Sequence, residues 1–315
     1  MSAVHDGRRT IQHDGIFYDD EDILVSAALA FVREGIAADE VVMVNTGSHF
    51  VTPLLRAVFA GDEQVVFAER PHYSNPAAAL DSYRRVMEKG LREGVRGYRA
   101  MGFIDFADSI LPWQEWVRYE AAVNEVFADL PFRTLCPYDT SRLPSVIIEP
   151  MKRARSGLVA GDGRHDNPDY VPPAALMGRD ELRTPPLAVQ GSAPRMVLEP
   201  GEELMELRME VYAATMFTDL PRRKVDDFVA AVGQVVANAH EHGKPPVRLR
   251  LWAADTQVVC TVTDQGHGID DPLLGWARPR RPEQGIGLWA SRQLVDVLDY
   301  DLADDGFTVR VAAFA

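Results

Sequence analysis

The sequence has few cysteines and no long apolar run. Only two cysteines, Cys136 and Cys260, occur among 315 residues. This number indicates no disulfide framework and suits a reducing compartment. The first ten residues lack the apolar core of a signal peptide, and no run approaches the ~18 apolar residues of a membrane span. We therefore expect a cytoplasmic protein that makes no membrane contact.

Basic residues are also in deficit. The chain has 33 Lys and Arg against 47 Asp and Glu, a formal net charge of -14. A protein whose main task is to grip a phosphate backbone favours a basic face, so we expect no direct nucleic-acid partner. A Gly-Lys-Ser/Thr phosphate loop is missing from Val44–His49, where the first predicted domain would carry one, so triphosphate binding is not expected there.

What is present first is an alternation of strands and helices. A length of 315 residues predicts two domains. Strands are predicted at 15–18, 41–44, 65–67, 99–103 and 132–136, and helices at 20–34, 49–59, 76–93 and 113–129. This order is typical of an α/β sheet with right-handed crossovers. The stretch from Leu158 to Pro194 is rich in Gly, Pro and Asp, which predicts a linker or an irregular connection.

Three motifs follow one another in the last third of the chain. They are Asn238 on a helix, Asp264-x-Gly266-x-Gly268 after a strand, and Gly285-x-Gly287 at the start of another helix. Each motif alone is weak, because Gly and Asp dominate turns generally. Their order and spacing within one domain-sized segment favour a nucleotide triphosphate site with magnesium.

The chemistry of each motif fits that ligand. Gln234 and Asn238 are four residues apart and share one helical face, and the Asn238 carbonyl oxygen is a suitable hard ligand for Mg²⁺. Asp264, at the end of the apolar run 258–263, can accept a hydrogen bond, while Gly266 and Gly268 permit backbone conformations closed to other residues. Gly285 and Gly287 let main-chain amides approach a phosphate at a helix start.

These segments resemble the N, G1 and G2 boxes of the GHKL ATPases, a superfamily that includes histidine kinases and anti-sigma-factor serine kinases. The resemblance implies an α+β sandwich of the Bergerat type that binds ATP or ADP. It implies that Asn238 binds Mg²⁺, that Asp264 binds the adenine amino group, and that Thr308 lies beside the adenine. The glycines of both boxes would then contact the nucleotide.

Position 234 departs from that pattern, because the family's catalytic Glu is here Gln234. A neutral amide cannot accept the proton of an attacking hydroxyl, and a general base typically contributes ~10²–10⁴-fold to rate. Glu241 is seven residues further along the helix, roughly 10 Å away at ~1.5 Å per residue. We therefore expect nucleotide binding with weak or absent phosphotransfer.

The arrangement of this domain resembles the RsbW-type anti-sigma-factor family. Residues 200–227 contain no His that could be a histidine kinase phosphoacceptor. The resemblance implies a sigma factor as partner, or a STAS-type anti-anti-sigma antagonist. A helix predicted at 202–217 presents an apolar stripe, Leu204, Leu207, Val211 and Ala214, that needs a cover, so a homodimer is expected.

The first domain resembles the MEDS sensory domain, named for methanogen, methylotroph and dichloromethane-regulator proteins. The points of likeness include His13–Tyr18, Arg99–Gly102, Trp116 with Tyr119-Glu120, and Leu135–Tyr138. The resemblance implies a RecA-like layered α/β sheet and a sensor for a small molecule or another signal. His13, His49, His72 and Cys136 could converge on a metal or small ligand, but the interpretation we favour is that each is a turn residue, a helix cap or a small core residue.

We thus expect a MEDS-like domain at 11–172, a linker at 173–194 and an ATP-binding domain at 195–315. The function expected is a signal-responsive, anti-sigma-factor-like regulator that binds ATP-Mg²⁺ and sequesters a sigma factor or related partner. One alternative is an active ATP-dependent serine/threonine kinase that acts on the antagonist. Another is a ligand-sensing adaptor that binds no nucleotide.

Overall fold

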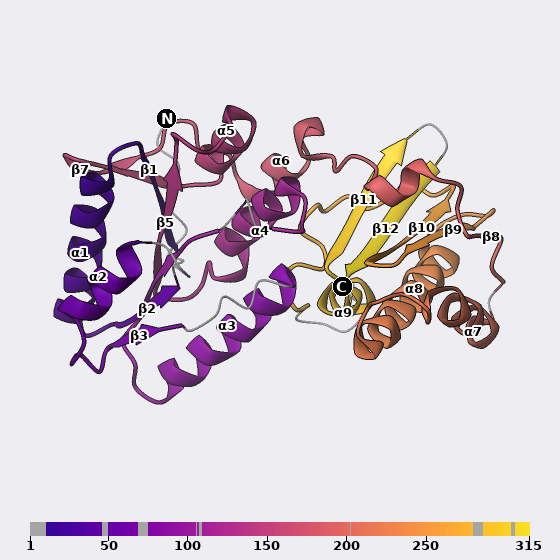
Figure 1. The fold of residues 1–315 in the computed structure, drawn as a ribbon, viewed down its shortest axis with the longest axis horizontal. Coiled ribbons are helices and arrows are strands. Elements are labelled where there is room, and N and C mark those ends of the chain that lie inside the picture. Colours follow the sequence, from indigo (N-terminus) through magenta and orange to yellow (C-terminus); the bar gives the residue numbers. More distant parts are fainter. Residues whose placement is uncertain are drawn as a thin grey trace. The chain divides into compact units, whose positions relative to one another are not determined.

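Two sheets organise the chain. The computed structural model describes residues 11–45, 50–68, 75–104, 106, 109–201, 203–279, 286–303 and 306–315 (Figure 1). The chain divides into two units. The first lies within residues 1–177, and the second comprises Gly178–Ala315 with two short earlier segments, Ser74–Ala79 and Ile110–Trp116. The expected pairing of an α/β domain with an α+β domain is confirmed.

The first unit is built on a mixed, mostly parallel sheet. Its strands are β1 (Gln12–Tyr18), β2 (Val41–Asn45), β3 (Val65–Phe67), β4 (Tyr98–Gly102), β5 (Phe132–Asp139), β6 (Gly157–Ala160) and β7 (Gly163–Asp166). They lie in the order β3-β2-β4-β5-β1-β6-β7, and β7 alone among them is antiparallel to its neighbour. In the β1–β5 register His13 lies opposite Thr134 and Gly15 opposite Cys136. His13, Thr134 and Cys136 therefore present their side chains to the same face of the sheet.

Helices connect these strands. They are α1 (Glu21–Ala37), α2 (Val51–Val58), α3 (Pro76–Arg92), α4 (Trp113–Val126) and α5 (Ser145–Arg153). Asp20 caps α1 by accepting a hydrogen bond from the amide of Asp22 at 2.9 Å. Buried apolar residues of α1 and α2, among them Leu24 and Leu55, pack on the sheet residues Ile16 and Val42. The face formed by His13, Thr134 and Cys136 is turned away from this core.

The predicted irregular segment begins too early. The prediction of irregular structure from Leu158 is wrong at its start, because β6 pairs with β1 in the sheet and with β7 in a hairpin. Gly163, at the start of β7, adopts φ +119°, a conformation that favours glycine. Glycines that read as linker in the sequence thus belong to a tight hairpin.

Short helices follow the hairpin. They are α6 (Pro173–Met177), η1 (Asp180–Leu182) and η2 (Ala188–Gly191). Leu176 and Leu182 are buried. The segment after the hairpin is therefore not fully exposed, because these two leucines are buried in the protein. The proposed domain limits at 172 and 195 remain predictions.

The second unit is an antiparallel sheet covered by helices. Its strands are β8 (Met196–Leu198), β9 (Arg248–Ala254), β10 (Gln257–Asp264), β11 (Val297–Ala303) and β12 (Gly306–Phe314), in the order β11-β12-β10-β9-β8. Its helices are α7 (Leu204–Thr215), α8 (Arg222–His242) and α9 (Ile286–Leu294), which lie on one side of the sheet in Figure 1. Phe228 and Val232 of α8 pack in one core with Leu249 and Val311 of the sheet.

The apolar stripe on α7 is covered within its own unit. Leu207 and Val211 are buried in the core, and Leu204 and Ala214 pack against it. Other apolar side chains near this helix are exposed instead, namely Met205, Met209, Met216 and Phe217. The stripe named in the sequence therefore needs no second subunit as a cover.

Among the described residues, none of the helices combines the length and apolar character that crossing a bilayer requires.

Candidate functional site

The polar pair on α8 is the first part of the candidate site. Val232, Val235, Val236 and Ala239 are buried in the core, whereas Gln234 and Asn238 are only partly buried. This division confirms the two faces predicted from helical spacing. The amide Nε2 of Gln234 donates a hydrogen bond to Oδ1 of Asn238 at 3.2 Å.

The start of α9 lies against this pair. A Cβ atom placed on Gly287 would be 2.5 Å from Nε2 of Gln234 and 3.1 Å from Oδ1 of Asn238. Any larger residue at position 287 would require the Gln234 amide to move. The first backbone amides of a helix have no partner within the helix, so the end of α9 beside this pair suits an anion. Gly285, the other predicted glycine of this motif, lies outside the described residues.

Asp264 ends β10 and is buried. Its Oδ1 accepts hydrogen bonds from the backbone amide of Gly266 at 2.6 Å and from that of Lys244 at 3.3 Å. A Cβ atom on Gly243, directly after α8, would lie 2.5 Å from the same oxygen. The end of α8 and the end of β10 therefore meet at this carboxylate.

The two glycines after Asp264 serve different needs. Gly268 has φ +84°, and a Cβ atom there would lie 2.8 Å from the Phe307 ring. The expectation of a special backbone conformation is confirmed at this glycine. Gly266 requires space instead, because a Cβ atom on it would lie 2.7 Å from Oδ1 of Asp264.

Thr308 lies on β12, opposite Thr263 in the β10–β12 register. The two hydroxyl oxygens are 2.7 Å apart. The neighbouring register pair joins Asp264 to Phe307. Because successive side chains of a strand point to opposite faces, Thr263 and Thr308 point to the face of the sheet opposite to that of Asp264, so the structure does not bring Thr308 beside the expected adenine ligand.

Sequence reasoning assigned no role to Gly243. The signal that could have found it is its place, immediately after the helix that carries Asn238. The structure thus brings Gln234, Asn238 and Gly287 together, and it joins Asp264 to Gly243 and Gly266. These residues form a candidate site at the C-terminal half of α8, the end of β10 and the start of α9.

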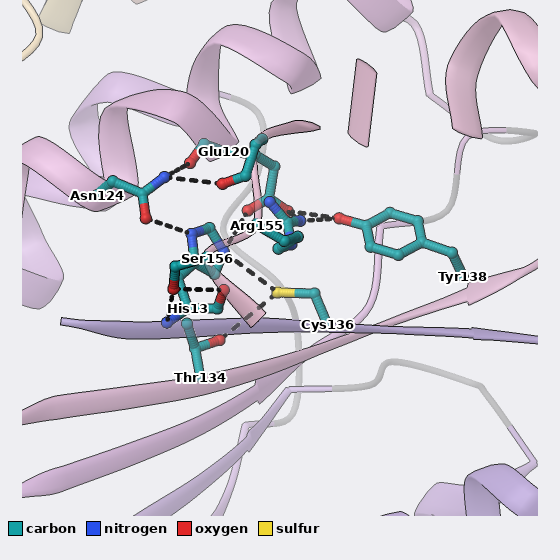
Figure 2. A network of polar contacts seen from close by, with 9 residues as sticks. His13, Glu120, Asn124, Thr134, Cys136, Tyr138, Arg155 and Ser156 are labelled. Carbon is teal, nitrogen blue, oxygen red and sulfur yellow. Dashed lines mark hydrogen bonds and ion pairs between the residues drawn. The ribbon is translucent and has the colours of Figure 1, made fainter. Parts of the chain in front are cut away.

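A second polar cluster lies in the first unit (Figure 2). Of the four residues singled out there, His13 and Cys136 do meet, with Nε2 of His13 3.7 Å from Sγ of Cys136. His49 and His72 lie outside the described residues. Glu120 of α4 joins the cluster, with Oε2 3.1 Å from Nε2 of His13. Glu120 was not among the residues that the sequence singled out as ligands, and its burial becomes visible only in the structure.

Arg155 completes the cluster and is fully buried. Its Nη2 lies 3.0 Å from Oε1 of Glu120 and also donates to the hydroxyl of Tyr138. A Cβ atom on Gly15 would lie 3.1 Å from Cγ of Arg155, so the glycine makes room for this side chain. A buried arginine of this kind is tolerated because a carboxylate is paired with it.

The surroundings set the ionisation of these groups. Burial, together with Arg155, lowers the pKa of His13. Burial opposes the ionisation of Glu120, but Arg155 and His13 outweigh it, so the pKa of Glu120 lies below its ordinary value. Burial, with a contribution from Glu120, raises the pKa of the Cys136 thiol to about 12. The cluster therefore pairs an ionised carboxylate with a guanidinium beside a neutral imidazole and a thiol.

Comparison with known families covers both units. Residues 12–154 match the model of MEDS, the MEthanogen/methylotroph, DcmR Sensory domain. Residues 199–313 match the model of the histidine kinase-like ATPase domain. A search of curated proteins finds no match to the chain.

Proposed function

We propose that this chain, which joins a MEDS sensory domain to a histidine kinase-like ATPase domain, is a signal-responsive regulator that binds ATP-Mg²⁺ in its second unit. The observation that carries this proposal is the approach of Gly287 to Gln234 and Asn238, which puts a helix start against a polar helix face. The residues fit both the metal and the nucleotide, because Asn238 offers a hard oxygen to Mg²⁺ and the α9 amides suit phosphate.

Each residue has its own part in binding. Asn238 would hold the metal, and Mg²⁺ when bound neutralises charge on the phosphates. Asp264 would accept a hydrogen bond from the adenine amino group. The bonds from Gly266 and Lys244 fix the orientation of the Asp264 carboxylate before any ligand arrives. Such pre-orientation lowers the entropy cost of binding.

We further propose that phosphotransfer is weak or absent, and that ATP acts mainly as a conformational ligand. The support is Gln234, whose amide contacts Asn238 and cannot take a proton from an attacking hydroxyl. The regulated partner would be a sigma factor or a related protein, held in a manner set by the nucleotide and by the signal at the first unit. The compact ATPase unit without a phosphoacceptor His in residues 200–227 supports this choice over a histidine kinase.

Nucleotide titration of the full chain tests the binding proposal. Calorimetry should show tight binding of ATP and ADP only when Mg²⁺ is present. Asn238→Ala should reduce the effect of Mg²⁺ on nucleotide affinity. Glu241→Gln is the matched control, because Glu241 is exposed on the same helix. Complete absence of nucleotide binding in folded wild-type protein would favour the ligand-sensing adaptor instead.

The partner needs a separate experiment. A pull-down from native cytoplasm with and without ATP should recover a sigma factor or a STAS-type antagonist, and mass spectrometry identifies it. Radiolabelled ATP incubated with that antagonist then distinguishes sequestration from phosphorylation. Rapid label transfer by wild-type protein would favour the active-kinase alternative.

A further inference from the structure

Three side chains of different chemistry converge in the first unit. His13 comes from β1, Cys136 from β5 and Glu120 from α4, and all three are buried. Their candidate donor atoms, an imidazole nitrogen, a thiol sulfur and a carboxylate oxygen, all lie within 4.8 Å of one another. Figure 2 shows them facing a common point between the sheet and α4.

Asn124 fixes which nitrogen of His13 carries the proton. Its Nδ2 donates to the backbone oxygens of Glu120 at 3.2 Å and Ala154 at 3.0 Å. The Asn124 oxygen Oδ1 is therefore the atom that faces Nδ1 of His13 at 3.1 Å, and it can only accept. Nδ1 must donate, so the lone pair of Nε2 points toward Glu120 and Cys136.

The contact between His13 and Glu120 then needs a positive centre. Nε2 and the carboxylate oxygen Oε2 lie 3.1 Å apart. With the imidazole proton on Nδ1, both atoms present lone pairs to each other. Either a second proton on the imidazole or a cation between the two atoms resolves the repulsion. A hydrogen bond from the other ring nitrogen is also the arrangement that orients a metal-binding histidine.

Glu120 divides its two oxygens between different tasks. Oε1 lies 3.0 Å from Nη2 of Arg155 and accepts a hydrogen bond from the hydroxyl of Tyr138 at 3.1 Å. Oε2 is directed at His13. The carboxylate is thus held so that one oxygen is presented toward the imidazole and the thiol.

We propose that Nε2 of His13, Oε2 of Glu120 and Sγ of Cys136 bind a divalent cation of the zinc type. Zinc takes nitrogen, oxygen and sulfur ligands at roughly 2.0–2.3 Å, which in a tetrahedron places the ligand atoms roughly 3.3–3.7 Å apart. The separations of 3.1 Å and 3.7 Å from Nε2 are close to this spacing. A thiolate together with an imidazole selects zinc or cobalt over magnesium or calcium. On binding, the Cys136 sulfur keeps its electron pair and its proton leaves to solvent.

The fourth position of this metal site faces a cavity. His13, Glu120 and Cys136 all line a cavity of about 260 Å³ whose walls also include apolar side chains such as Met43, Val86 and Phe127. All of these residues belong to the first unit. Three protein ligands with one open position are typical of a zinc site that exchanges its remaining ligand, while structural sites are closed by four. A small molecule in the cavity could thus bind the metal at its fourth coordination position.

Cobalt binding to the full chain tests the proposal. Metal-free protein titrated with Co²⁺ should develop the near-ultraviolet thiolate-to-cobalt band and the visible bands of tetrahedral cobalt, saturating at one metal per chain. Zn²⁺ should displace the cobalt and abolish both. Cys136→Ser should remove the thiolate band, while Cys260→Ser, which changes the buried thiol of the other unit, should leave it intact.

Either of two results would overturn the proposal. A folded wild-type chain that develops no thiolate band at saturating Co²⁺, or a band that Cys260→Ser removes, rejects the site. Should Cys136→Ser fail to fold, Glu120→Gln provides the second test. It retains the shape of the side chain, and it should weaken Co²⁺ binding by an order of magnitude or more while the thiolate band persists. Unchanged Co²⁺ affinity in that variant would remove Glu120 from the ligand set.

Discussion

Gln234 donates a hydrogen bond to Asn238, one turn further along α8, at 3.2 Å. The residue that stands where a general base is expected is thereby engaged with the residue expected to bind the metal. A carboxylate at position 234 could not make this bond as a donor. Asn238 would have to turn its amide group and donate instead, which is possible because an Asn side chain carries both an NH₂ donor and a carbonyl acceptor. A substitution at position 234 therefore also affects the orientation of the expected Mg²⁺ ligand.

Gln234→Glu should raise ATP turnover. The side chains have nearly the same shape, and the carboxylate adds a proton acceptor whose effect belongs to the transition state. A gain within the ~10²–10⁴-fold range typical of a general base is expected, with nucleotide affinity little changed. Turnover is measured for both proteins, alone and with a cognate antagonist. Brisk wild-type turnover that Gln234→Ala abolishes would contradict the expectation.

Asp264→Asn should weaken adenine nucleotides. The replacement keeps an oxygen that can accept from Gly266 and Lys244, but it loses the charge of the acceptor, worth ~1.5–3 kcal/mol. Calorimetry with ADP should show an affinity roughly 10- to 150-fold lower. Asp226→Asn, at an exposed position of α8, is the control. Equal losses in both variants would mean that the effect is not one of recognition.

Gly287→Ala should separate stability from binding. Alanine favours a helix over glycine by up to ~1 kcal/mol, so α9 itself is not weakened. The new methyl group would lie 2.5 Å from Nε2 of Gln234, and that side chain must move. We expect weaker ATP-Mg²⁺ binding at unchanged melting temperature. Gly201→Ala, where a Cβ atom meets open space, should bind like wild type.

Gly268→Ala should destabilise the second unit. A residue with a Cβ atom at φ +84° costs ~1–2 kcal/mol, and contact with the Phe307 ring adds to this. Denaturant unfolding should show a lower midpoint. Gly191→Ala, at a position with open space and no positive φ, serves for comparison. A midpoint equal to that of wild type would show that the loop relaxes freely.

A homodimer is expected from the exposed apolar side chains of α7. Met205 and Met209 are each 67% exposed and lie one turn apart, with Phe217 beyond the helix end at 78%. Met209→Glu should dissociate the dimer into monomers, whereas Val146→Glu, at an exposed site in the first unit, should not. Light scattering measures the mass. A wild-type mass of one 35.0 kDa subunit at micromolar concentration would count against pairing.

Periodicity was a good guide wherever local pattern and tertiary packing agree. The strands and helices between Gln12 and Asp139 could be predicted because apolar residues recur with the period of each element. The β6–β7 hairpin was missed because Gly161 and Gly163 give the same composition to a tight turn and to a linker. The sequence predicts the apolar stripe on α7, but it does not show that this stripe packs against the core of its own unit.

The two candidate sites differ in how well they could be predicted from the sequence. Asn238, Asp264 and Gly287 lie in three motifs that follow one another within one domain-sized segment, so their order in the sequence could point to them. His13, Glu120 and Cys136 come from three separated elements, and only the strand order β5-β1 and the placement of α4 unite them. Arg155 is more distant still. Its place depends on Gly15, whose missing side chain nothing in the sequence connects to an arginine 140 positions later.

Strand β1 works as a two-sided element. His13 faces the cluster with Glu120, whereas Asp14 faces the other side and accepts from Nε of Arg164 on β7 at 2.9 Å. Because neighbouring residues point to opposite faces, a slip of one residue would put either Asp14 and Gly15 or Gln12 and His13 in the places of His13 and Asp14. A one-residue insertion or deletion at the start of β1 would therefore erase two interactions that no single substitution removes together. The length of this strand, and not only its composition, is under constraint.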